Sequence, residues 1–297
     1  SASGSWDDAD EKDRRKYLQN GRVPSDYPAP VAADYPDCLA IVEEKVKPER
    51  QRKKQNGQYA LRKPLPQRWW HYAEKRPALY AAIAGMERVL VIPETTKYCA
   101  FSVCSTGQVF SHMTKVISED DLAIFSTLSS SLHDCWARTH SSTLESRLKY
   151  ITTDAYETWP APLDSPILCN LGETYHKTRR ELFHTRGEGL TKTYNRFHDP
   201  DEDAQDIMRL RALHAEMDRA VADAYGWTDL DLGHDFHETK QGIRFTVCEA
   251  ARREILDRLL ALNHERYAEE VAQGLHDKGK KKSKKPKSKR TSKNRDD

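Results

Sequence analysis

The sequence has no long apolar run. No uninterrupted apolar stretch approaches the ~20 residues that a membrane-spanning helix requires. The first residues, SASGSWDDADEKDRRK, are too polar and acidic for a secretory signal. Hydrophobic residues make up 37% of the 297 residues, which is still enough for the core of one or two domains. We therefore expect a cytoplasmic protein without membrane contact. Because the chain begins with Ser1 rather than Met, we expect it to be part of a longer one.

Cysteine is scarce, and no two cysteines form a C-x-x-C pair. Their spacing fits neither a small disulfide-bonded scaffold nor a zinc ribbon. We expect most of them to be small core residues in a reducing compartment. The six are Cys38, Cys99, Cys104, Cys135, Cys169 and Cys248.

The common catalytic signatures are missing as well. The sequence has no P-loop, no G-x-G-x-x-G at a helix start, no G-x-S-x-G and no H-E-x-x-H. The piece GHDFHET, residues 233–239, holds metal-ligand residue types, but polar side chains are expected in a loop between two helices. Cys135 has His133 and His140 nearby and no orienting acid, so a core cysteine is the better interpretation. We expect no catalytic residues, no metal and no cofactor in this segment.

The net charge of +2 hides two opposite parts. Residues 278–297 hold eleven Lys or Arg and two Asp, so they carry +9 and the rest of the chain carries −7. A Lys-rich run with Ser, Gly and Pro cannot bury apolar surface, so residues 276–297 are predicted to be a disordered tail. Such a tail could bind nucleic acid through counterion release, or it could only keep the protein soluble. Composition leaves both roles open.

The rest of the chain predicts an α+β fold. A linker over residues 1–35 is followed by a small β-sheet with packed helices over residues 36–165. Leu39, Val42 and Val46 repeat at helical spacing, and Pro48 is expected to end or kink that helix. Runs rich in Val, Ile, Tyr and Phe predict short strands at residues 88–93, 97–104, 108–111 and 114–118.

Helices are predicted after these strands. Ser118 and Asp121 form a capping signal for a helix whose apolar face extends from Leu122 to Trp136. From residue 166 to residue 275 the pattern predicts an all-α helical bundle and no strand. One of its helices carries an apolar stripe that consists of Ile207, Leu210, Leu213 or His214, Met217, Val221 and Ala224.

Several motifs then follow one another in a distinctive order. Residues 46–50 read VKPER, residues 69–79 read WWHYAEKRPAL, and residues 94–98 read ETTKY. Ser130, His133 and Trp136 are followed by Thr143, Leu144 and Tyr150, and WPAP occupies residues 159–162. This series resembles the target-recognition domain of type IIL and IIG-like restriction–modification enzymes. It also resembles related adenine-N6 methyltransferases of BREX- and DISARM-type phage defence. The resemblance extends over about residues 36–270, including the helical part.

The resemblance implies recognition of double-stranded DNA. The family's S-adenosylmethionine motif and its N-P-P-[YF] motif, which holds a flipped adenine, are absent from the sequence. The cofactor S-adenosylmethionine is thus expected in an associated catalytic domain, on the same chain or on another one. Further subunits of a defence system are possible partners. Whether this segment belongs to an enzyme is left open.

The resemblance also indicates which residues meet DNA. Arg or Lys suits guanine and Glu suits cytosine, so alternating Glu145, Arg147 and Lys149 on one side of an extended segment are the first candidates for base readout. A solvated charge cluster is the alternative. His112 and Thr114 are expected to support them. Trp69 and Trp70 are expected to anchor a helix against the sheet. The expected backbone contacts are Arg68, Lys75, Arg76, Lys97, Lys115 and Arg138.

The sequence therefore predicts the DNA-recognition region of a site-specific adenine-N6 methyltransferase. Two other functions remain open. One is a DNA-binding specificity subunit that never had a methylase. The other is a scaffold whose helical bundle docks other defence subunits, and absence of DNA affinity would favour it.

Overall fold

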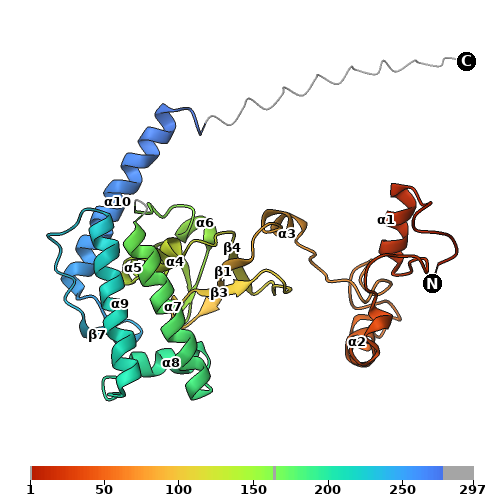
Figure 1. Cartoon of the computed structure of the whole chain (residues 1–297), viewed down its shortest axis with the longest axis horizontal. Helices are drawn as coiled ribbons and strands as arrows, with labels where there is room; N and C mark the ends of the chain where they lie inside the picture. Colours follow the sequence, from red (N-terminus) through yellow and green to blue (C-terminus); the bar gives the residue numbers. More distant parts are fainter. Residues whose placement is uncertain (1, 163–164, 277–297) are drawn as a thin grey trace, which may run out of the picture. The chain divides into compact units, whose positions relative to one another are not determined.

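The computed structural model describes residues 2–162 and 165–276, which form two compact units (Figure 1). One unit extends to Tyr80 and the other starts at Ala81. The predicted Lys-rich tail lies outside the described residues except for His276. No described helix is both long and apolar enough to cross a membrane.

The first unit has little interior. Helix α1 (Glu11–Asn20) begins at Asp10, whose carboxylate accepts a hydrogen bond of 2.7 Å from the backbone N–H of Asp13. It lies within the segment predicted as a linker. A 3₁₀ turn, η1 (Ala32–Asp34), precedes α2 (Pro36–Arg50). Among the described residues of this unit only Pro24 and Pro66 are buried, so no apolar core forms there.

Helix α2 differs in length from the prediction. It passes through Pro48 and ends at Arg50, two residues further than expected. A proline removes one helical hydrogen bond, and near the end of a helix only one turn is left to be disturbed. Leu39, Val42 and Val46 are only partly buried, so their spacing predicted the helix but not a packed face.

The second unit is built around a three-stranded antiparallel sheet of order β3-β1-β4. Its middle strand is fully covered, because Val89, Leu90, Val91 and Ile92 are all buried. The strand predicted at 97–104 is shorter, and residues 108–111 form no strand because they belong to the loop before β4. The strands are β1 (Arg88–Pro93), β3 (Ser102–Ser105) and β4 (Thr114–Ile117), and a short helix α3 (Pro77–Ala82) precedes them.

Two helices replace the single one predicted after Asp121. α4 (Leu122–Ser129) begins at Asp121, whose carboxylate accepts from the N–H of Ala123 at 2.7 Å. α5 (Ser131–His140) begins at Ser130, whose hydroxyl accepts from the N–H of His133 at 3.2 Å. The break arises because Ser130 has the extended backbone of a helix cap. The one-turn α6 (Thr152–Ala155) follows.

Helices dominate the part from Pro166 onward, as predicted (Figure 1). The stripe on α9 is buried as expected at Ile207, Leu210, His214, Met217 and Val221. A two-stranded hairpin of β7 and β8 was not predicted, since GHDFHET was taken for a loop. The elements are α7 (Pro166–Arg186), α8 (Leu190–Phe197), α9 (Gln205–Ala224), β7 (Asp235–Thr239), β8 (Gly242–Thr246) and α10 (Glu249–Ala272).

Sheet and helices share their interior. One apolar cluster joins Leu90 of β1 and Phe125 of α4 to Met217 of α9. A second cluster joins Trp136 of α5 to Leu259 of α10. The second unit is therefore held together across residue 166 by common cores. All six cysteines are free, with Cys135 buried and Cys38 and Cys169 exposed, so the expectation of core cysteines is wrong for the last two.

Buried Asp218 organises polar groups inside the helical part. Its carboxylate accepts from the backbone N–H of Ser131 at 2.7 Å and is hydrogen-bonded to His234 at 2.8 Å. The ring of His237 is hydrogen-bonded to the carbonyl of Gly233 at 2.8 Å. The two histidines of GHDFHET thus have structural hydrogen bonds.

Candidate nucleic-acid interface

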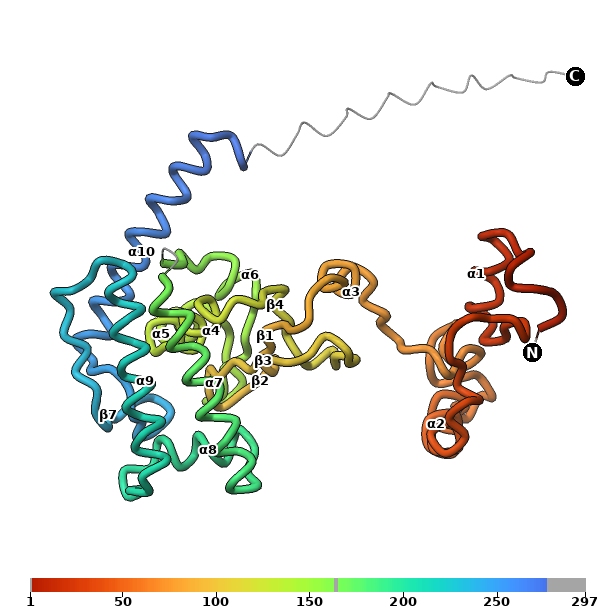
Figure 2. The backbone as a smooth tube through the Cα atoms, viewed as in Figure 1, coloured from red at the N-terminus to blue at the C-terminus, as the bar shows by residue number. Residues whose placement is uncertain are grey.

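A second small sheet carries the main candidates for base contact. It consists of β2 (Thr95–Thr96), β6 (Arg147–Lys149) and β5 (Ser142–Leu144) in the order β2-β6-β5. Figure 2 follows the backbone from β1 directly into β2. β5 and β6 form a tight hairpin, and β6 also pairs with β2 in an antiparallel manner.

The pleat of β6 places the predicted cations on one side. Leu148 is completely buried, whereas Arg147 and Lys149 on either side of it are exposed. Neighbouring side chains of a strand point to opposite faces, so one buried leucine fixes both cations outward. Of the three alternating residues predicted to project from one side of an extended segment, Arg147 and Lys149 do so and Glu145 does not.

Glu145 lies in the turn of the hairpin instead of on a strand. Its φ is +59°, an unusual value for a residue with a side chain. Its carboxylate is 2.7 Å from the guanidinium of Arg147, and both side chains are substantially exposed. Glu145 and Arg147 therefore present an acceptor and a donor side by side at the hairpin tip.

Glu94 joins the hairpin to the other sheet. Its N–H donates to the carbonyl of Met113 at 2.7 Å, and its carbonyl accepts from the N–H of Tyr150 at 2.8 Å. Thr114 pairs with Pro93, and Lys149 pairs with Thr95.

The start of β4 and the end of β6 therefore lie on either side of the stretch that leads from β1 to β2. Thr114 and the exposed His112 before it therefore lie on the opposite side of this stretch from Lys149. Lys115 is ion-paired with Glu94 at 3.5 Å, which ties its charge to the same junction.

Buried polar contacts support the end of β6. The ring of His133 is hydrogen-bonded to the hydroxyl of Tyr150 at 3.0 Å, and both residues are fully buried. Burial lowers the pKa of His133 to about 3, so its ring is neutral at physiological pH. The sequence motif had singled out both residues, but not their contact.

The expected backbone contacts fall into two groups. Lys97 and Arg138 are adjacent, because Arg138 donates to the carbonyl of Lys97 at 3.2 Å. Arg138 is also held by Asp134 at 2.8 Å, and the attraction of that carboxylate raises the pKa of the guanidinium. Arg68, Lys75 and Arg76 lie in the first unit.

Trp69 and Trp70 do not belong to the helix that they were expected to anchor against the sheet. Residues 63–70 form turns, and Trp69 and Trp70 meet edge to face with ring centroids 5.7 Å apart. A side chain at Gly21 would come within 2.8 Å of Trp70, and the ammonium of Lys47 lies 5.2 Å from the ring of Trp69. The rings therefore pack on α1 and α2, because the chain before α3 turns with the two prolines and the glycine of residues 57–66.

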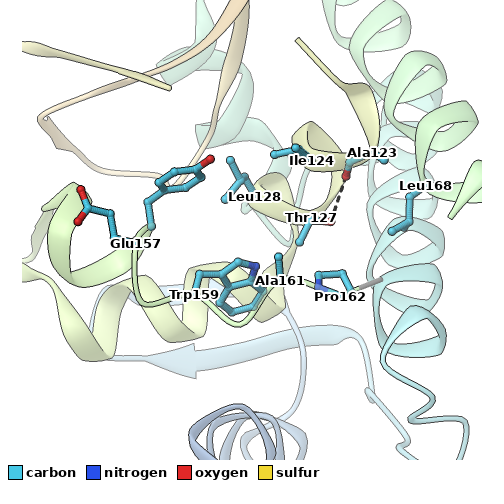
Figure 3. A pocket seen from close by; sticks show the side chains of 10 residues that line it. Ala123, Ile124, Thr127, Leu128, Glu157, Trp159, Ala161, Pro162 and Leu168 are labelled. Atoms are coloured by element: carbon cyan, nitrogen blue, oxygen red, sulfur yellow. Dashed lines mark hydrogen bonds between the residues drawn. The ribbon is translucent and has the colours of Figure 1, made fainter. Parts of the chain in front are cut away.

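A separate pocket of about 320 Å³ lies beside α4 (Figure 3). Trp159 and Pro162 face Thr127 and Leu128 across it, and among the described residues that line it Glu157 is the one with a charge. Such a lining disfavours phosphate. None of the candidate DNA contacts belongs to this pocket.

The comparisons with known proteins bear on residues 38–163. These residues match the family described as MmeI, target recognition domain. Residues 38–163 are therefore similar to the target recognition domain of MmeI. No curated protein matches the chain.

One similar solved structure is that of the type IIL restriction–modification enzyme MmeI in complex with DNA. The TM-score is 0.46 with 16% sequence identity, over 81% of this chain and 28% of that one. The present chain thus spans little more than a quarter of the length of that enzyme. The β5–β6 hairpin with Arg147 and Lys149 lies inside the matched target recognition domain.

Proposed function

We propose that this chain specifies the DNA site of an adenine-N6 methyltransferase in a restriction–modification or phage-defence system of the cytoplasm. The match of residues 38–163 to the MmeI target recognition domain carries the proposal. The exposed charged face of β6 supports it, because Arg147 and Lys149 both point into solvent, where they are free to meet a duplex.

The hairpin tip has the chemistry of base readout. A two-stranded ribbon fits the major groove, which is roughly 12 Å wide. There the guanidinium of Arg147 could donate two hydrogen bonds to guanine, while the carboxylate of Glu145 could accept one from cytosine. The 2.7 Å ion pair between them holds both groups in one orientation before DNA arrives. Lys149 on one side of the β1–β2 stretch, and Thr114 and His112 on the other, would add further contacts.

Methyl transfer requires groups from elsewhere. The sequence contains neither the N-P-P-[YF] motif nor the S-adenosylmethionine motif of the family. We therefore assign both to a catalytic domain that acts with this chain, in cis or in trans. This chain's part would be to hold the duplex so that the target adenine meets that domain.

A selection experiment tests this function. The full chain, and the chain shortened to residues 1–276, would be incubated with randomised duplex DNA at near-physiological salt, and the retained DNA would be sequenced. Both should enrich one short motif. Arg147→Ala should relax the preference at one position, since a good bidentate base contact contributes about 1–3 kcal/mol of discrimination.

Arg253→Ala is the matched control. Arg253 is also exposed and also paired with a nearby glutamate, Glu249 at 2.8 Å, but it lies on α10. Its loss should leave the motif unchanged. Retention of no DNA, or of all sequences equally, would contradict the proposal and favour a scaffold or an obligate subunit.

A further inference from the structure

The β7–β8 hairpin brings an arginine to the target recognition domain from outside it. Arg244 of β8 lies beyond residue 163, yet its guanidinium carbon is 5.2 Å from the ring centroid of Tyr98. The hairpin is fixed in place by aromatic contacts, because Phe245 meets Phe197 at 5.5 Å. The guanidinium of Arg211 lies 4.9 Å from the ring of Phe236 on the other strand. Arg244 is therefore presented by a packed element.

Lys97 approaches the same ring. Its ammonium is 5.2 Å from the centroid of Tyr98 and donates to the side-chain carbonyl of Asn195 at 2.8 Å. The two cationic groups are therefore no further apart than twice 5.2 Å. The carbonyl of Lys97 is held by Arg138, which fixes the backbone from which the lysine extends.

The charges of this cluster also affect the pKa of the neighbouring His198. His198 stacks on Tyr98 with ring centroids 5.0 Å apart. Burial holds the pKa of His198 well below its ordinary value, and the charges of Arg244, Arg138 and Lys97 lower it further. His198 is therefore neutral and does not change the net charge of the cluster.

The cluster has more positive than negative charge. Asp134 neutralises Arg138. In the described part of the chain no carboxylate lies within ion-pair distance of Lys97 or Arg244. Arg244 donates to the carbonyl of Ile243 at 2.9 Å, which leaves most of its five N–H donors for another acceptor. Two uncompensated cations remain around one aromatic ring.

The cluster also adjoins the base-reading hairpin. Thr95 pairs with Lys149 and Thr96 with Leu148, so the next residue, Lys97, leaves β2 beside Arg147. Adjacent strands are about 5 Å apart, which is less than the width of a DNA groove. A phosphate at this cluster would belong to the duplex whose bases the hairpin reads.

We propose that Lys97 and Arg244 bind a backbone phosphate of the recognised DNA, with Arg138 as a positioning residue. The β7–β8 hairpin would thereby be a second DNA-contacting element outside the target recognition domain. This inference rests on the proposed function in one respect, namely that the phosphate belongs to the duplex whose bases the β5–β6 hairpin reads. A phosphate contact is independent of sequence and sets register and orientation.

The test measures affinity against salt concentration with the full chain and a duplex that carries the enriched motif. Arg244→Gln and Lys97→Gln should each reduce the slope of log K against log salt by about one, since one phosphate contact is lost. Both should leave the enriched motif unchanged. In the double variant the slope should fall by less than the sum of the two single falls, because both residues meet one phosphate. Arg244→Lys should restore much of the slope.

Lys240→Gln is the control, because Lys240 is an exposed cation in the turn of the same hairpin. It should behave as the wild type. A melting curve for each variant checks folding, and exposed Lys97 provides the test if Arg244→Gln does not fold. An unchanged slope in both variants, or a changed motif, would overturn the phosphate site.

The two proposals can fail separately. If the wild-type chain enriches a motif and Arg244→Gln keeps the full slope of log K against log salt, only the phosphate site is contradicted. A wild-type chain that binds duplex without a preferred motif, with a lower slope in Arg244→Gln, would contradict base reading alone. A chain that binds no duplex would overturn both.

Discussion

At the scale of residues, Glu145 combines an unfavourable backbone with an exposed carboxylate. Its φ of +59° belongs to the left-handed region, where a side chain costs roughly 1–2 kcal/mol. Glycine would avoid most of this cost but could not pair with Arg147. Strain of this kind at an exposed hairpin tip is typical of a functional position.

Glu145→Gly should therefore stabilise the protein. The relief of strain exceeds the added freedom of glycine in the unfolded chain, so the free energy of unfolding should rise by up to about 1 kcal/mol. Urea unfolding followed by circular dichroism measures it. Glu145→Ala keeps the strained backbone and should show no such gain. A Gly variant less stable than the Ala variant would contradict the strain.

His133 predicts how stability changes with pH. Its pKa is about 3 in the folded protein and 6.5 in the unfolded chain, so below pH 6.5 only the unfolded chain takes the proton. Stability should thus fall by about 1.4 kcal/mol per pH unit between those values, or about 2 kcal/mol from pH 6.5 to pH 5. His133→Gln should show a smaller fall in urea unfolding. The stability of His112→Gln, which replaces an exposed histidine, should fall as much as that of the wild type. Equal falls in all three proteins would refute this role of His133.

At the scale of elements, Gly172 allows α7 to lie directly against α4. A Cβ atom at Gly172 would meet the carbonyl oxygen of Leu122 and lie 2.6 Å from the hydroxyl of Ser126. One contact is with backbone, which cannot rotate away. Helix propensity alone would favour alanine at this position by about 1 kcal/mol.

Gly172→Ala should nevertheless destabilise the protein by roughly 1–3 kcal/mol, because the two helices must move apart. Chemical unfolding of the two proteins side by side gives the difference. Gly85→Ala is the control, since a Cβ atom there meets nothing within 4 Å. A stabilised Gly172→Ala would mean that the close contact is absent.

The elements also show what the sequence could and could not predict. The apolar stripe of α9 and strand β1 followed directly from periodicity. The break at Ser130 did not, because an apolar face that continues from Leu122 to Trp136 conceals a cap. The β7–β8 hairpin was missed because its polar residues resembled a loop, although the turn T-K-Q-G between two Phe-containing runs was a signal for it. Arg244 was missed with it.

In the candidate site, too, the sequence predicted some features and not others. Alternation along residues 147–149 was sufficient to orient Arg147 and Lys149. The turn at Glu145 could not be read from residue types, since glycine or asparagine is the usual signal for such a turn. The contacts of Arg244 with Tyr98 join positions far apart in the chain, which no local pattern encodes.

At the scale of the whole molecule, the two units differ in how they are stabilised. The second unit has extensive apolar cores, whereas the first buries only two prolines among its described residues. Residues 45–76 of the first unit hold eleven Lys or Arg and two Glu. Repulsion among these cations opposes a compact state, and anions would relieve it.

Limited trypsin digestion of the chain shortened to residues 1–276 should therefore cut first within residues 45–76. A fragment that begins near residue 81 should persist longest, because its cleavage sites are in packed helices and strands. Mass spectrometry of the early fragments measures this. Added duplex should slow the cuts if Arg68, Lys75 and Arg76 meet phosphate, as the sequence predicts. First cuts at Arg147 or Lys149 would contradict the prediction that the second unit is more stable than the first.

The distribution of free thiols gives the protein an intrinsic pair of labelling positions. Cys38 lies exposed on α2 of the first unit, and Cys169 lies exposed on α7 of the second. Burial raises the pKa of the thiols of Cys99, Cys104 and Cys135, which slows their reaction with maleimides. Cys248 of the second unit is half-buried and is a third accessible thiol, so brief labelling of a Cys248→Ser variant should place one fluorophore on each unit. Energy transfer between the dyes would then report in real time how the units move when a ligand is added.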